Sequence, residues 1–233
     1  MSLDKRVAGA VEALADLTDG ARVMVGGFGL SGNPESLIRQ LADSGVRRLT
    51  IISNNVGNQG RGLAVLLQND QVAAAHCSFV GGNPDLEQAI MEGRVKVELN
   101  PQGTLAERIR AGGAGIGGFF TPTGAETVIA EGKETREIDG RLHVFETPLH
   151  ADFALIRAAK ADPFGNLVFH RTSRNFQPMM AMAAKTTVVE AETLVPLGAI
   201  DPDEVHLPGI FVQRVFQGGP YENPIEYRTT RAG

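Results

Sequence analysis

Residues 19–34 read DGARVMVGGFGLSGNP, and this stretch decides the fold of the chain. It predicts a tight turn, an apolar strand over residues 23–25, a glycine-rich loop and, at Asn33-Pro34, the start of a helix. A glycine loop at the carboxyl end of a strand lets the backbone approach a ligand closely, and such loops bind anions and cofactors. The glycine spacing taken alone fits ligand binding and a plain turn about equally well.

Strand–helix units repeat through the first half of the chain. We expect strands at residues 23–25, 49–52, 73–80 and 95–99, with helices after them and an amphipathic helix over residues 7–17 ahead of them. Asn33 and Asn83 each precede a proline and are expected to cap a helix, and Thr104 with Glu107 matches a capping box. Successive units of this kind predict an α/β fold, with an open, mainly parallel sheet and flanking helices.

The second half of the chain has a different pattern. Asp139-Gly140 marks the turn of a β-hairpin excursion near residues 133–147. Further strands are expected at residues 153–156, 167–169 and 187–189, with a buried helix over residues 179–184. No stretch is rich enough in glycine, serine or proline to separate two domains. We therefore expect residues 1–233 to form a single domain, with a loose tail or partner-binding arm over residues 219–233.

Polar groups follow several of the expected strands at the point where each strand ends. The glycine loop over residues 26–33 follows the first strand, Asn54-Asn55 follows the second, and Gln102 lies within the loop after the fourth. Because parallel strands send these loops to one edge of the sheet, we expect them to share one rim. That rim would bring together backbone N–H groups and the side-chain amides of Asn54, Asn55 and Gln102.

Composition excludes several classes of protein. The net charge of −5 and the isoelectric point near 5.6 argue against nucleic-acid binding, which needs basic stripes. A lone cysteine, Cys77, permits no intrachain disulfide, and no apolar run approaches the ~18 residues of a membrane span. The five histidines show no metal-ligand spacing, so no metal site is expected. These features predict a cytoplasmic protein that binds neither nucleic acid nor membrane.

Several longer motifs carry a family resemblance. Besides residues 19–34 they are Ser53-Asn54-Asn55, PQGTLAERIR (101–110), GGAG (112–115), TPTG (121–124), ADFAL (151–155) and Arg174-Asn175-Phe176. Together they resemble the α subunit of succinyl-CoA:3-oxoacid CoA-transferases, within the family I coenzyme A transferases. The similarity extends over residues 4–218, and its motifs are more specific for the family than for the acyl acceptor.

The resemblance implies half of an enzyme. Members of this family move CoA from a thioester to a carboxylate by a ping-pong route through a glutamyl-CoA thioester. The attacking glutamate lies in a Ser-Glu-Asn-Gly sequence on the β subunit, and this sequence is absent here. The resemblance thus implies that the partner is a β subunit, in an αβ or α2β2 assembly. It also implies a coenzyme A thioester as substrate, no permanently bound cofactor, and acetoacetate or 3-oxoadipate as acceptor.

The resemblance also implies roles for the rim residues. Gln102 would donate to the oxyanion or substrate carbonyl, and Asn54 and Asn55 would orient the substrate or the glutamate. Acyl transfer independently calls for such fixed, non-titrating donors. The CoA-binding candidates lie in the glycine loop and are Gly26, Gly27, Phe28, Gly29, Leu30, Ser31 and Gly32.

Other interpretations stay open at this point. Within the family, the acceptor could be acetate or butyrate. A sugar-phosphate isomerase would need an acid–base pair in the strand-end loops, where none is evident. A non-catalytic CoA-binding module is a further alternative. Arg108, Arg110, Arg171 and Arg174 could meet CoA phosphates or form ion pairs, while Cys77 and Asp152 are expected to be structural.

Overall fold

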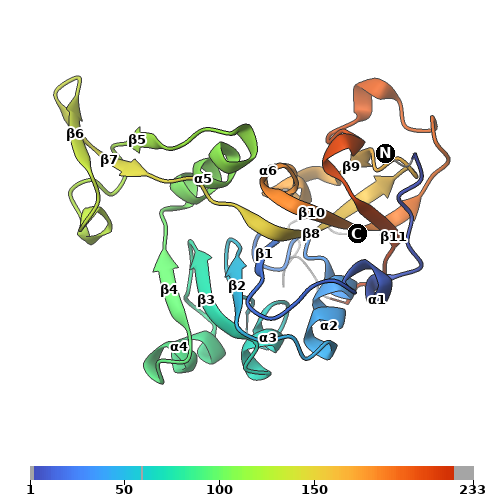
Figure 1. Cartoon of the computed structure of the whole chain (residues 1–233), viewed down its shortest axis with the longest axis horizontal. Helices are drawn as coiled ribbons and strands as arrows, with labels where there is room; N and C mark the ends of the chain where they lie inside the picture. Colours follow the sequence, from blue (N-terminus) through green and yellow to red (C-terminus); the bar gives the residue numbers. More distant parts are fainter. Residues whose placement is uncertain (1–2, 59, 223–233) are drawn as a thin grey trace, which may run out of the picture.

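A computed structural model describes residues 3–58 and 60–222 of the chain (Figure 1). The α-helices are α1 (Ala10–Ala13), α2 (Glu35–Asp43), α3 (Ala64–Gln68), α4 (Pro84–Met91), α5 (Gln102–Ala114) and α6 (Gln177–Ala183). The strands are β1 (Arg22–Val25), β2 (Leu49–Ile52), β3 (Val72–Cys77), β4 (Lys96–Leu99), β5 (Phe119–Thr121), β6 (Thr135–Ile138), β7 (Arg141–Glu146), β8 (Ala151–Ala161), β9 (Leu167–Val168), β10 (Ala184–Leu194) and β11 (Arg214–Gln217). Short 3-10 helices include η2 (Arg171–Arg174).

The main sheet has the strand order β11-β10-β8-β1-β2-β3-β4. Every neighbouring pair along this path is parallel, and the short strand β9 joins β8 in antiparallel orientation. The prediction of an open, mainly parallel sheet is therefore confirmed. The direction of strand addition reverses between β1 and β8, because β2, β3 and β4 extend the sheet on one side and β10 and β11 on the other.

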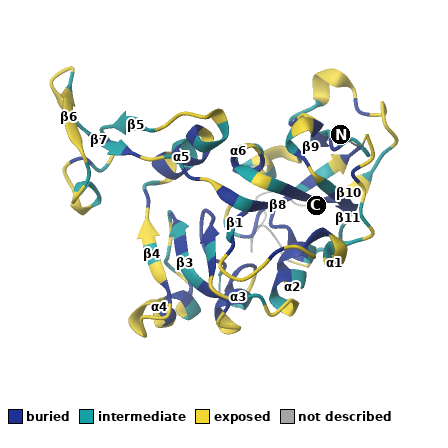
Figure 2. Cartoon of the chain, in the orientation of Figure 1, coloured by how far each residue is buried: buried dark blue, intermediate teal, exposed yellow. Residues whose placement is uncertain are grey.

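Helices cover both faces of this sheet, which explains why successive residues of its central strands β1 and β2 are buried, whereas the edge strand β4 is largely exposed (Figures 1 and 2). Val23 and Val25 of β1 belong to one buried cluster, together with residues of α1, α2, α3 and α4. Met24 points to the opposite face and joins a second cluster with residues of α5 and α6. Successive residues of one strand thus supply two cores.

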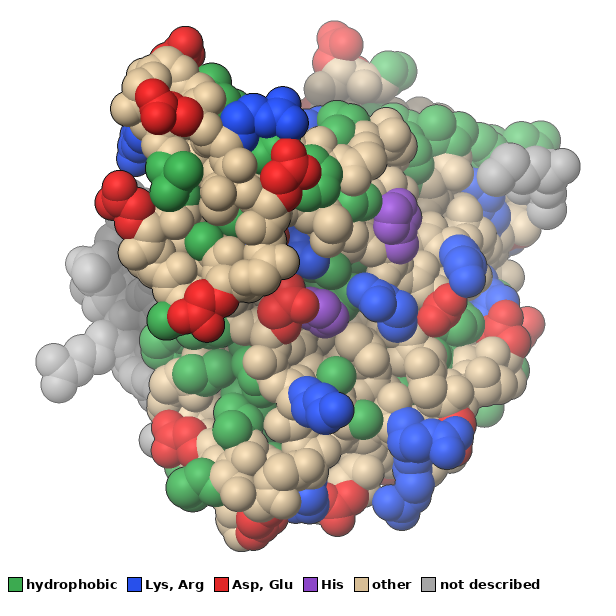
Figure 3. All heavy atoms as spheres, turned by 60° about the vertical axis from the view of Figure 1, so that its left-hand side comes forward, with side chains coloured by type: hydrophobic (Ala, Val, Ile, Leu, Met, Phe, Trp, Pro, Cys, Tyr) green, Lys and Arg blue, Asp and Glu red, His purple; other side chains and the backbone are tan. Residues whose placement is uncertain are grey.

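The predicted hairpin forms part of a projecting arm (Figure 1). Strands β6 and β7 pair in antiparallel orientation, and Asp139 and Gly140 of their turn have φ angles of 51° and 72°. Strand β5, which the sequence did not predict, pairs with the other side of β7. Figure 3 shows this arm above the body, with acidic, basic and hydrophobic side chains interspersed on the face in view.

The first predicted helix is wrong in length. Helix α1 has four residues, and the chain continues through a turn in which Leu17 N–H donates to the Leu14 carbonyl. Both leucines are buried as the spacing predicted, but Val11 is 70% exposed. A single helical turn gains little by itself, so packing of these leucines decides the path of the chain.

Two of the three predicted helix caps are also wrong. Asn83 does cap α4, since its side chain accepts from the Leu86 N–H at 3.2 Å. Asn33 makes no cap contact with α2; the Glu190 carboxylate of β10 accepts from the Leu37 N–H instead, at 2.8 Å. Burial raises the pKa of the Glu190 carboxyl to about 7.

Helix α5 begins at Gln102, two residues before the predicted capping box. Its N-cap residue is Pro101, which has no side-chain acceptor. Thr104 Oγ1 is buried without a hydrogen-bond partner, and Glu107 pairs with Arg110 at 2.6 Å. Neither Thr104 nor Glu107 therefore accepts a hydrogen bond from the free N–H groups at the start of α5.

The last described residues lie against α2. The Gly219 N–H donates to Ser36 Oγ at 3.2 Å, and the Arg157 guanidinium carbon lies 3.4 Å from the centroid of the Tyr221 ring. Of the predicted loose tail, residues 219–222 are thus in contact with the body, and residues 223–233 lie outside the described residues. None of the helices within residues 3–58 and 60–222 is long and apolar enough to cross a bilayer.

Candidate functional site

A cavity of about 320 Å³ opens at the carboxyl ends of β1, β2 and β3, beside the start of α5. This volume lies within the range of small-molecule sites, roughly 300–1,000 Å³. Its described lining residues come from three loops and the first residue of α5, and they are Phe28, Gly29, Asn54, Asn55, Asn58, Ser78, Phe79 and Gln102. The structure thus brings Asn54, Asn55 and Gln102 onto one rim, as the parallel topology predicted.

The two asparagines after β2 are buried at the rim of the cavity. Asn54 and Asn55 are 4% and 5% exposed. Asn55 Nδ2 donates to Asn58 Oδ1 at 2.8 Å, and the Asn54 carbonyl accepts from the Ser78 N–H at 2.9 Å. The backbone at Asn54 and the side chain of Asn55 are thus held in place, and donors that are fixed before reaction can stabilise developing negative charge without reorganising.

Ser78 and Phe79 line the cavity although the sequence did not identify them. The prediction continued the third strand to residue 80, whereas β3 ends at Cys77. Ser78 Oγ is buried without a hydrogen-bond partner, and Phe79 is 57% exposed. Because β3 ends before them, Ser78 and Phe79 belong to the loop at the rim of the cavity and not to the strand.

The glycine loop is divided between the cavity and the body. Phe28 and Gly29 line the cavity, with Phe28 51% exposed at its mouth. The remaining candidates of the loop are not among the described lining residues of the cavity, and they are Gly26, Gly27, Leu30, Ser31 and Gly32.

Asn175 and Gln177 hold that second part of the loop. Gln177 is fully buried, and its Nε2 donates to the Gly32 carbonyl at 2.7 Å. Asn175 Nδ2 donates to the Ser31 carbonyl at 3.1 Å, and Asn175 Oδ1 accepts from the Gly27 N–H at 3.2 Å. Sequence reasoning did not identify these two amides as site residues, and they fix the backbone of the glycine loop from the start of α6.

The cavity carries no formal charge on its described lining residues, which are amides, a hydroxyl, a glycine and two aromatic rings. Cys77 is an implausible nucleophile beside it, since burial raises the pKa of the thiol to about 11. No group of three or more potential metal ligands occurs among the described residues. The arrangement can orient an acyl group and stabilise an oxyanion, but it offers no ionised nucleophile.

The arginines considered for phosphate binding have different environments. Arg108 is 5% exposed and paired with Glu98, so it is not available at the surface. His76 and Arg108 beside Glu98 hold the pKa of its carboxyl at about 2. Arg110 pairs with Glu107, while Arg171 lies on η2 at the surface. Asp152 pairs with Lys185 at 2.9 Å, as the structural interpretation expected.

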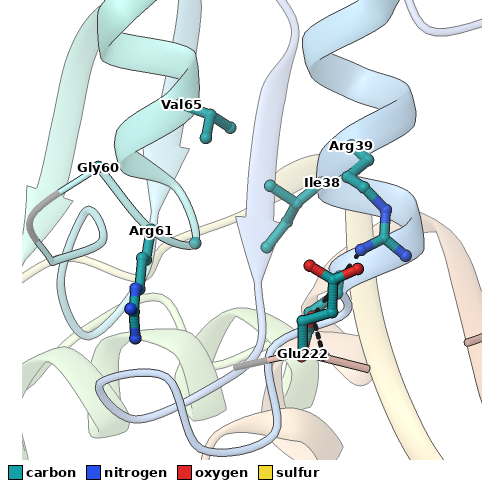
Figure 4. A pocket seen from close by; sticks show the side chains of 8 residues that line it. Ile38, Arg39, Gly60, Arg61, Val65 and Glu222 are labelled. Atoms are coloured by element: carbon teal, nitrogen blue, oxygen red, sulfur yellow. Dashed lines mark hydrogen bonds and ion pairs between the residues drawn. The ribbon is translucent and has the colours of Figure 1, made fainter. Parts of the chain in front are cut away.

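A second cavity, of about 330 Å³, lies between α2 and the loop before α3 (Figure 4). Two of its charged side chains, Glu35 and Arg39, face each other. Glu35 Oε2 accepts from the Glu222 N–H at 2.9 Å and lies 3.9 Å from Arg39 Nη1, and Arg39 also donates to the Pro220 carbonyl. It lacks the array of neutral amides that distinguishes the strand-end cavity.

Comparisons with known proteins give a consistent result. A sequence profile described as coenzyme A transferase matches residues 7–218. The A subunit of the succinyl-CoA:3-ketoacid coenzyme A transferase of Xanthomonas campestris pv. campestris (strain B100) is 54% identical over 230 residues, covering 98% of this chain and 95% of its own. The A subunit of the 3-oxoadipate CoA-transferase of Pseudomonas putida is 51% identical over 215 residues, covering 91% of this chain and 93% of its own.

Solved structures share the fold. An acyl-CoA transferase apoenzyme from Escherichia coli O157:H7 superposes with a TM-score of 0.84 at 23% identity. The superposition covers 94% of this chain and 48% of that chain. The fold described here therefore corresponds to about half of a longer polypeptide in that structure.

Proposed function

The chain belongs to the coenzyme A transferase family, and we propose that it is the α subunit of an enzyme that moves CoA from succinyl-CoA to a 3-oxoacid. The observation that carries this proposal is the strand-end cavity, which gathers neutral polar groups from three loops and the start of α5 and has no carboxylate among its described lining residues. Such a cavity is suited to stabilising acyl-transfer intermediates, provided that the nucleophile comes from another chain.

The proposed mechanism divides the chemistry between two chains. A glutamate on the β subunit attacks the donor thioester and expels CoA thiolate, which leaves a mixed anhydride; the thiolate then attacks the glutamyl carbonyl, which releases succinate and forms a glutamyl-CoA thioester. The acceptor carboxylate repeats these steps in reverse, so that CoA ends on the acceptor and the glutamate is regenerated. Gln102 donates to the oxygen that becomes negative in the tetrahedral intermediates, and Asn54 and Asn55 orient the reacting groups. Phe28 and Phe79, both more than half exposed at the mouth, would exclude water once the partner covers them.

The finer assignments are part of the same proposal. The names of relatives at about equal identity favour acetoacetate-like and 3-oxoadipate acceptors alike. Acetate or butyrate remains the alternative acceptor class. The assembly would be αβ or α2β2 with no permanently bound cofactor, and the location cytoplasmic.

Turnover should require the partner. We expect no succinyl-CoA to 3-oxoacid transfer by the purified chain alone, and transfer after co-expression with a β subunit that carries Ser-Glu-Asn-Gly. The assay follows formation of the new acyl-CoA with acetoacetate, 3-oxoadipate and acetate offered separately, and the preferred acceptor identifies the substrate.

Two results of this assay would overturn the proposal. Turnover by the rigorously purified chain alone would place the nucleophile on this chain. Binding of CoA by the assembled pair without transfer to any of the three acceptors would support a non-catalytic CoA-binding module instead.

A further inference from the structure

We propose that Arg108 is a positioning residue for Gln102, and this inference rests on the proposed role of Gln102 in the strand-end cavity. Arg108 is not among the described lining residues of that cavity and lies on α5, six positions after Gln102. Its guanidinium fixes the junction between β4 and α5, and that junction determines where the Gln102 amide is presented.

The guanidinium of Arg108 joins three segments of the chain. Its Nη1 donates to Asn100 Oδ1 at 2.5 Å and to the Glu98 carboxylate, both at the end of β4. Its Nε donates to the Thr147 carbonyl at 2.7 Å, and its Nη2 to Thr147 Oγ1 at 3.3 Å. Thr147 lies between β7 and β8, at the base of the arm, so one planar fork holds α5 to the strand before it and to the arm.

No side chain at the start of α5 caps the helix and so fixes the position of Gln102 locally. Pro101 offers no capping side chain, and Thr104 Oγ1 has no partner. The turn before Gln102 is held through Asn100, whose N–H donates to the Cys77 carbonyl at 2.8 Å and whose Nδ2 donates to the Glu98 carbonyl at 3.0 Å. The remaining side-chain atom of Asn100, Oδ1, depends on Arg108.

The ionic groups at this junction include two that are buried, Arg108 and Glu146. The Arg108 side chain is 6% exposed and that of Glu146, 3.8 Å from Arg108 Nε, is 2% exposed. Lys133 pairs with the other oxygen of Glu146 at 2.7 Å. Buried ion pairs add little net stability relative to apolar side chains, because desolvation offsets their attraction. Arg108 is therefore best explained by the geometry that it fixes next to the cavity.

The test uses the assembled complex with its β subunit. Arg108→Gln is expected to lower kcat by about 10- to 100-fold with KM changed less than about threefold, because misplacing a catalytic group by ~1 Å costs up to about 100-fold. Arg108→Lys keeps the charge beside Glu98 but cannot reach Asn100 and Thr147 together. We expect it to lower the thermal midpoint by less than Arg108→Gln does and still to lower kcat. The control is Arg94→Gln, which removes exposed pairs with Asp70 and Glu92 and should leave kcat unchanged.

A double-mutant cycle separates positioning from a general structural effect. In a Gln102→Ala background, Arg108→Lys should lower kcat by less than about twofold further, because residues that act as one unit are not additive. A full, multiplicative loss in that background, or normal kcat in Arg108→Lys, would overturn the inference. If Arg108→Gln fails to assemble, kcat is measured in Arg108→Lys and in Asn100→Ala, which removes the side chain that Arg108 contacts. Both variants are expected to have a lowered kcat. If Gln102→Ala itself left kcat unchanged, the proposed role of Gln102 would fail, which is a distinguishable result.

Discussion

Replacing Gln102 with alanine is expected to lower kcat of the assembled enzyme by about 100- to 1,000-fold, as removal of one oxyanion donor does in other acyl-transfer enzymes. Gln102 is the first residue of α5 and lines the cavity together with Asn54 and Asn55. Its donation strengthens as the carbonyl oxygen becomes negative, so the loss falls mainly on kcat, and KM for succinyl-CoA should change little. Steady-state kinetics with separate variation of donor and acceptor measure both constants.

Two further variants sharpen this result. Gln102→Glu keeps the side-chain size but replaces the amide donor with a carboxylate, and should lower kcat at least as far as alanine. Gln88→Ala is the matched control, since Gln88 lies on another helix and its side-chain amide donates to the exposed Glu92. Equal kcat in wild type and Gln102→Ala would remove Gln102 from the proposed mechanism.

Replacing Gly26 with alanine is expected to destabilise the chain by about 2–4 kcal/mol, through overpacking and through buried polar groups left unpaired. The backbone of Gly26 does not have a positive φ, so the effect arises from lack of space. An added Cβ would lie 2.6 Å from Gln177 Cδ, and closer still to its Oε1. Gln177 could move away only by giving up its hydrogen bonds to the Gly32 carbonyl and the Arg157 N–H.

Thermal unfolding of the assembled complex measures this loss, and a midpoint lower by roughly 5–15 °C is expected. Gly9→Ala is the control, because its Cβ would meet nothing within 4 Å. In a Gln177→Ala background, Gly26→Ala should cost less than about 1 kcal/mol, since the colliding amide is gone. An equal cost in both backgrounds would mean that the collision with Gln177 is not the cause.

Local sequence patterns predicted the part of the fold that local forces determine. Strand β2 has the predicted bounds, and β1 differs by one residue, because each is a short apolar run between turn-forming residues. The shared rim of Asn54, Asn55 and Gln102 followed from parallel topology alone. The hairpin turn at Asp139-Gly140 was equally readable, since Asp-Gly favours the left-handed backbone that this turn adopts.

Long-range contacts decided what the sequence could not predict. Asn33 has the composition of a cap, yet helix α2 receives its acceptor from Glu190, 153 positions away. Gln177, which holds the glycine loop, is 145 positions from Gly32. Phe79 and Val80 have high strand propensity, so no local signal ended β3 at Cys77 and exposed Ser78 and Phe79 as site residues.

The location of covalently bound CoA tests the central claim, that this chain supplies fixed neutral donors while its partner supplies the nucleophile. The assembled complex is incubated with succinyl-CoA in the absence of acceptor and then denatured in acid, and the intact mass of each chain is measured. We predict that the β subunit gains the mass of CoA and that this chain stays unmodified. In Gln102→Ala the same adduct should form more slowly. A CoA adduct on this chain would contradict the account, because the nucleophile would then lie among residues to which it assigns only orientation and charge stabilisation.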